Sequence, residues 1–152
     1  MNQSTLKPDQ VISNLNNLIE INRDGQSGFK ESAEKIAATQ IRQFCFEHSR
    51  THAQFVGELQ PLVLSLGSEP DNKGTVLGDL HRVWIDLKSA MGGGDHAILV
   101  ATESAVDQAI SGYKKALDEP LPAYMRDIVE RQLQGIEQAH SKVRQMREAL
   151  AQ

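Results

Sequence analysis

The stretch "GSEPDNKG" at residues 67–74 ends one long helical pattern and opens the longest connection in the chain. Gly, Pro, Asn and Asp favour turns, and Gly67 is placed to end the preceding helix as its C-terminal cap. The next long helical pattern begins only at Asp95, after "GGG" at 92–94. The connection over residues 67–94 is therefore long enough to run back along the full length of a helical bundle.

Working outward from this connection, apolar residues recur every three or four positions rather than every two, which predicts helices and no sheet. The predicted helices lie at about 8–37, 40–66, 75–91, 95–118 and 122–149. Asp95 is the expected N-cap of the fourth of these.

The links inside the first pair and the last pair of long helices are short, so each pair is expected to form an antiparallel hairpin. The prediction is an all-α fold in a single domain, residues 1–152. Its connectivity is that of a ferritin-like four-helix bundle, with one long crossover that carries a short extra helix.

Composition excludes several classes of protein. The chain of 152 residues has 39% hydrophobic and 24% charged residues and a net charge of −4, which is typical of one globular domain. No basic cluster with interleaved aromatics is present, so no nucleic acid is expected as a partner. No apolar run reaches the length of a membrane span, and the first residues do not resemble a secretion signal, so we expect a cytoplasmic protein without membrane contact.

Polar residues interrupt the apolar stripes near the middle of each long helix. They are Asn22 and Gln26, His48 and His52, Glu103 with Asp107 beside it, and His140 with Glu137 beside it. Because mid-helix positions of an antiparallel bundle share one layer, these residues predict a polar layer across the centre of the core.

Two interpretations of that layer remain open. In "QGIEQAHSK" (134–142), Glu137 and His140 are three residues apart and point to the same side of a helix. Glutamate and histidine at this spacing hold iron or manganese in several helical bundles. The other interpretation is a hydrogen-bonded core without metal, since buried polar groups must be paired with one another or with an ion.

Four stretches carry a resemblance to a known family: "LNNLIEINRDGQSGFKESAEK" (15–35), "LHRVWIDLKSA" (80–90), "DHAILVATESAVDQAISGYKKAL" (95–117) and "ERQLQGIEQAHSKVRQMR" (130–147). Together they resemble an uncharacterised bacterial family, a domain of unknown function with a ferritin-like four-helix fold. The resemblance covers nearly the whole chain. It implies the fold strongly and an activity weakly, because one fold hosts many functions.

The ferritin-like di-iron pattern places a Glu on two helices and Glu-x-x-His on the other two. By resemblance, Glu103 stands for the Glu of the third long helix, and Glu137 with His140 for the last Glu-x-x-His. His52 stands for the histidine of the second helix. These four residues form the predicted metal set, with Gln26 as a further member if the layer is only a buried polar network.

The chain departs from the pattern where Gln26 and Ser49 occupy positions that would carry acids. With two of the four carboxylates missing, the site lacks the negative charge that would balance two divalent ions. We therefore predict a non-catalytic interaction or stress-associated protein with a degenerate metal site, no catalytic residues and no cofactor. The alternative is a ferritin-like oxidase or iron-handling protein with two irons, or with one iron, manganese or zinc ion. A homo-oligomer and the identity of any protein partner are left open.

Overall fold

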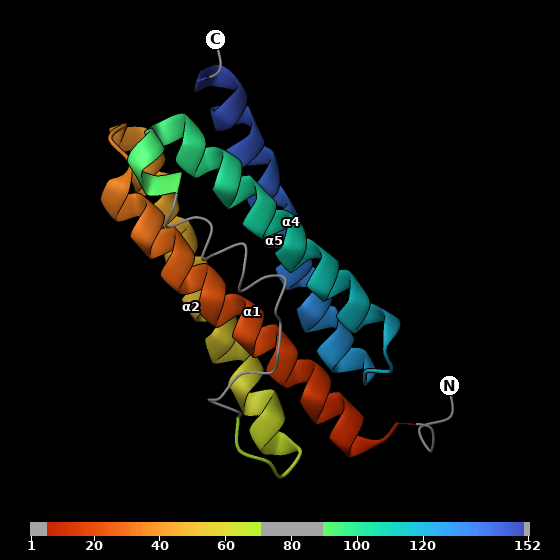
Figure 1. The fold of residues 1–152 in the computed structure, drawn as a ribbon. Coiled ribbons are helices and arrows are strands. Elements are labelled where there is room, and N and C mark those ends of the chain that lie inside the picture. Colours follow the sequence, from red (N-terminus) through yellow and green to blue (C-terminus); the bar gives the residue numbers. More distant parts are fainter. Residues whose placement is uncertain (1–5, 71–89, 151–152) are drawn as a thin grey trace.

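The structure, a computed structural model, describes residues 6–70 and 90–150, and within these ranges it contains helices and no strand (Figure 1). The long helices are α1 (Pro8–Lys35), α2 (Thr39–Ser65), α4 (Asp95–Asp118) and α5 (Ala123–Leu150), and a short 3-10 turn, η2, spans Met91–Gly93. The all-α prediction is confirmed, and the four long helices begin and end within two residues of the predicted positions. The predicted helix 75–91 lies almost wholly outside the described residues.

The four helices form two hairpins that pack against each other (Figure 1). Helix α1 packs against α2 and α4, α4 packs against α5, and the contact between α2 and α5 is the lightest of the four. At one end, the Asn14 side-chain amide donates to the carbonyl of Ala116 at 3.0 Å. At the other end, Asp95 contacts the link between α1 and α2. These contacts make α4 antiparallel to α1, so the chain crosses the length of the bundle between α2 and α4.

All four long helices contribute apolar residues to the core, and the stripe of α1 is among its most deeply buried parts. Leu15, Leu18, Ile19, Phe29 and Ala33 are completely buried. Burying a side chain such as Leu or Phe contributes about 1.5–3 kcal/mol, so this stripe is a major source of stability. The 3–4 spacing of the stripe explains why these residues form a helix rather than a strand.

Gly67 ends α2 as the sequence predicts. Its φ of 83° lies in the left-handed region, which glycine adopts without steric cost. Its backbone N–H donates to Leu64 O at 3.0 Å, and the next N–H, of Ser68, donates to Val63 O at 3.4 Å. This pair of bonds is the Schellman motif, and it satisfies carbonyls that the helix end leaves free.

Asp95 does not cap its own helix. Gly94 is the N-cap of α4, and the Asp95 carboxylate accepts hydrogen bonds from the backbone N–H groups of Ala37 (2.8 Å) and Ala38 (2.9 Å). Ala38 is the N-cap residue of α2. The prediction was wrong about which helix is capped, because the carboxylate binds free N–H groups that lie beside it only in the folded bundle.

Candidate functional site

A buried hydrogen-bonded group, here named the polar centre, takes one residue from each long helix: Asn22, His52, Tyr113 and Gln132. His52 Nδ1 lies 2.8 Å from Asn22 Oδ1. Asn22 Nδ2 donates to the Tyr113 hydroxyl at 2.6 Å, and that hydroxyl donates to Gln132 Oε1 at 2.7 Å. All four side chains are 0–2% exposed, so these bonds replace the water that each polar group would otherwise bind.

The chain of hydrogen bonds ends at a charged pair near the surface. Gln132 Nε2 donates to Glu58 Oε1 at 2.9 Å and makes a longer contact, 3.4 Å, with the carbonyl of Phe55. The other oxygen of Glu58 accepts from Arg131 Nη1 at 3.2 Å, and the Glu58 side chain is a quarter exposed. One carboxylate therefore receives hydrogen bonds from the core and from a surface guanidinium.

The polar centre is electrically neutral near pH 7. Burial, and then the neighbouring His48, hold the pKa of His52 well below its ordinary value. Burial raises the pKa of Tyr113, against a lowering by its hydrogen bond from Asn22 and with a further rise from Glu58. A group of neutral hydrogen-bonded side chains in the core serves to fix the relative positions of helices, and it contains no charged base or activated nucleophile.

His48 extends this site along α2 but is not part of the hydrogen-bonded chain. Its ring lies 4.6 Å from that of His52, 4.5 Å from Phe29 and 5.9 Å from Phe44, as distances between ring centroids. Burial lowers its pKa to about 4, so the imidazole is neutral. Among the described side chains, its Nε2 is the buried polar atom that lacks a hydrogen-bond partner. The site is therefore polar on one side of His52 and aromatic on the other.

The structure pairs two of the predicted metal residues, Glu103 of α4 and His140 of α5, with other side chains. Both oxygens of Glu103 accept from Arg147 Nε at 3.0 Å, so the guanidinium balances this carboxylate. His140 Nε2 lies 2.6 Å from Asp107 Oδ1, and its side chain is about one-fifth exposed. Glu137 is exposed on α5. Within the described ranges, no three His, Cys, Asp or Glu side chains gather as a metal site would require.

Of the predicted metal set, His52 alone lies in the polar centre, and of the wider predicted polar layer Asn22 lies there too. Gln26 was wrongly predicted as a member of a buried network, since its side chain is exposed and only its backbone carbonyl is used, accepting from Ser49 Oγ at 2.8 Å. Its place in α1 is taken by Asn22, one turn earlier. Whether the predicted residues bind an ion stays a prediction.

The error on α4 and α5 comes from how the two hairpins are aligned. Asn22, at the middle of α1, bonds to Tyr113 in the last third of α4, and Tyr113 bonds to Gln132 in the first half of α5. Glu103 lies ten residues before Tyr113, which is about 15 Å along a helix. Equating the midpoints of all four helices therefore placed the polar layer too near the start of α4.

Two of the missed residues leave a signal in the sequence. Tyr113 is on the apolar stripe of α4, and a buried tyrosine hydroxyl usually needs a partner. Gln132 falls on the stripe of α5, three residues after Val129 and four before Ile136. The role of Glu58 has no such signal, since glutamate is common on helix surfaces.

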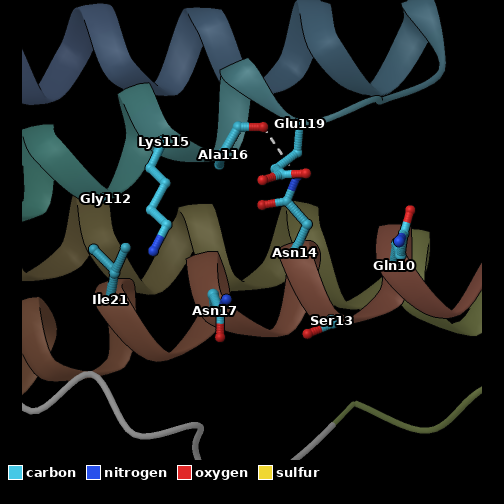
Figure 2. A pocket seen from close by; sticks show the side chains of 9 residues that line it. All are labelled: Gln10, Ser13, Asn14, Asn17, Ile21, Gly112, Lys115, Ala116 and Glu119. Carbon is cyan, nitrogen blue, oxygen red and sulfur yellow. Dashed lines mark hydrogen bonds between the residues drawn. The ribbon is translucent and has the colours of Figure 1, made fainter.

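A second candidate site is a groove of about 280 Å³ between the first half of α1 and the end of α4 (Figure 2). Gln10, Ser13, Asn14, Asn17, Ile21, Gly112, Lys115, Ala116 and Glu119 line it. The amide and hydroxyl side chains come from α1, and the charged ones from α4 (Lys115) and its C-cap residue (Glu119). Asn14, buried at its floor, uses its amide to hold the two helices together. Its volume lies just below the range of about 300–1,000 Å³ that is typical of small-molecule sites.

A comparison with protein families matches residues 10–119 to a family described as a domain of unknown function, DUF2383. The match spans well over half of the chain, and the chain belongs to this family. A search of curated proteins finds no significant match. No helix in the described part of the chain combines the length and the apolar character that crossing a membrane requires.

Proposed function

We propose that this chain is a non-catalytic, ferritin-like bundle protein in which hydrogen bonds have taken the place of a metal centre. The observation that carries the proposal is the polar centre itself, which joins all four long helices through His52, Asn22, Tyr113 and Gln132. Such a position, in the core between facing helices, is where helical bundles build metal sites. Here the bonds are made between neutral groups, which suits a role in holding the helices in register.

The pairing of the remaining acids supports the same proposal. A bundle that holds two divalent ions needs several carboxylates that face one another. In this chain Glu103 is neutralised by Arg147, and Asp107 pairs with His140. The function of such a bundle is then to present its surface to a partner. Association with stress, a bacterial source, a cytoplasmic location and self-association remain predictions that belong to this proposal.

The alternative is a ferritin-like oxidase or iron-handling protein that uses His52, Glu103, Glu137 and His140. Metal analysis of protein purified without chelators separates the two. We expect well under one equivalent of iron, manganese or zinc per chain. About one ion per chain, lost in His140→Ala or His52→Ala, would favour a single-metal site. About two ions, lost in Glu137→Ala but kept in the exposed control Glu130→Ala, would establish a di-metal site.

A further inference from the structure

The hydrogen bonds of Asn22 leave its amide one orientation. Its Nδ2 lies 2.8 Å from the carbonyl oxygen of Leu18 and 2.6 Å from the Tyr113 hydroxyl. A backbone carbonyl can only accept, so the group beside Leu18 must be the NH₂. Turning the amide over would set two oxygens against each other. Asn22 Oδ1 therefore faces His52.

The other end of this chain of hydrogen bonds, at Gln132, independently indicates the same direction of donation. The Glu58 carboxylate and the Phe55 carbonyl can only accept, so Gln132 must direct its NH₂ toward them and its oxygen toward Tyr113. The hydroxyl of Tyr113 then donates to Gln132 and accepts from Asn22. The bonds that link Asn22, Tyr113, Gln132 and Glu58 therefore all donate in the same direction, toward Glu58, and such aligned chains strengthen each bond.

We propose that Asn22 fixes the tautomer of His52, so that the imidazole holds its proton on Nδ1 and keeps Nε2 unprotonated. At 2.8 Å from Asn22 Oδ1, Nδ1 must be the donor, because that oxygen carries no proton to give. In water, histidine prefers the proton on Nε2, so the protein selects the less common form. Asn22 acts as a positioning residue, as the hydrogen-bond partners of functional histidines generally do.

This inference defines the kind of ligand that His52 can take. The unprotonated Nε2 can bind a hydrogen-bond donor, a proton or a Lewis-acidic metal ion, and it cannot bind a carbonyl or carboxylate oxygen. The proposal concerns the free protein and goes beyond the proposed function. Metal analysis can overturn the proposed function and leave the tautomer of His52 unchanged. The experiment below can show a different tautomer and leave the metal content unchanged.

The test is ¹⁵N NMR of histidine-labelled protein at pH 7, where protonated and unprotonated ring nitrogens resonate far apart. The His52 signals are assigned by their loss in His52→Gln. We expect Nδ1 at the protonated position and Nε2 at the unprotonated one. Tyr113→Phe, which leaves the Leu18 contact of Asn22 intact, should keep this pattern. Asn22→Ala should move His52 toward the Nε2-protonated form.

Three outcomes would overturn the proposal. The first is an Nε2-protonated His52 in the unaltered protein, which needs no variant to observe. The second is a change of tautomer in Tyr113→Phe, since Leu18 alone should hold Asn22 in place. The third is an Asn22→Ala protein that stays folded and keeps the Nδ1-protonated form. If Asn22→Ala does not fold, the first two measurements still decide.

Discussion

His52 lies against Gly25, at a point where α1 and α2 pack closely together. A Cβ atom added at Gly25 would lie 2.7–2.8 Å from three atoms of the His52 imidazole. That ring is held by Asn22 on one edge and is stacked 5.7 Å from Phe29, so it has little freedom to move. A glycine in a helix interior is normally unfavourable, and here the close approach of His52 explains it.

We predict that Gly25→Ala destabilises the protein by about 1–3 kcal/mol, because overpacking outweighs the gain in helix propensity. Denaturant unfolding measures this directly. Gly57→Ala is the matched control, since Gly57 is also helical and has nothing within 4 Å of the added Cβ. It should stabilise by about 0.5–1 kcal/mol. A Gly25→Ala protein as stable as the unaltered one would show that His52 is not held as described.

At the scale of the helices, Asp95 joins the start of α4 to the start of α2. Its carboxylate bonds the N–H groups of Ala37 and Ala38, and it sits at the positive end of the α2 dipole. It therefore connects the two hairpins near one end of the bundle, while Asn14 connects them near the other.

We predict that Asp95→Ala lowers the free energy of unfolding by about 0.5–2 kcal/mol, the usual cost of losing an N-cap. Hydrogen exchange should also become faster at Ala37 and Ala38. Asp127→Ala is the control, because Asp127 is exposed and lies beyond the first turn of α5. Equal effects of the two substitutions would argue against capping between helices.

Helices could be predicted from the sequence because their signal is local. The apolar period, Gly67 and the short links set the four long helices to within two residues. The polar centre could not be predicted in the same way, because it depends on how far one hairpin is shifted along the other. That shift is set by packing between residues distant in sequence, such as Asn14 with Ala116. Asn22 and His52 were predicted in the layer because they lie at the middle of α1 and α2, the two helices of one hairpin. Glu103 and His140 were misplaced because they belong to the second hairpin, whose position along the first was not predicted.

At the scale of the whole molecule, two buried neutral histidines make stability depend on pH. The pKa of His48 is about 4 in the folded protein, against 6.5 ordinarily, and that of His52 is also lowered. The unfolded chain therefore binds protons below pH 6.5 that the folded chain does not. The contribution of these two histidines to the free energy of unfolding is fully present above pH 6.5 and falls as the pH decreases. The part that comes from His48 is lost by about pH 4.

We predict that His48 alone lowers the free energy of unfolding by about 2 kcal/mol as the pH falls from 6.5 to 5, because one unit of pKa difference corresponds to about 1.4 kcal/mol. Denaturant unfolding of the unaltered protein and of His48→Phe over this range gives the difference. The variant should lose the part of the pH dependence that comes from His48 and keep the part that comes from His52. Identical pH dependence in the two proteins would mean that His48 is not buried as a neutral group.

We propose that the hydrogen bonds of the polar centre, and not a metal ion, fix the register of the four helices around their apolar core. The most direct test is the thermal unfolding midpoint of protein purified without chelators, measured with a chelator and with added Fe²⁺, Mn²⁺ or Zn²⁺. An ion that binds the folded state and not the unfolded state must raise this midpoint. We predict no change in any of these conditions, whereas Tyr113→Phe, which leaves Gln132 Oε1 without its donor, costs about 1–3 kcal/mol. A midpoint that falls with chelator and recovers with one of the ions, in a protein indifferent to Tyr113→Phe, would contradict the claim.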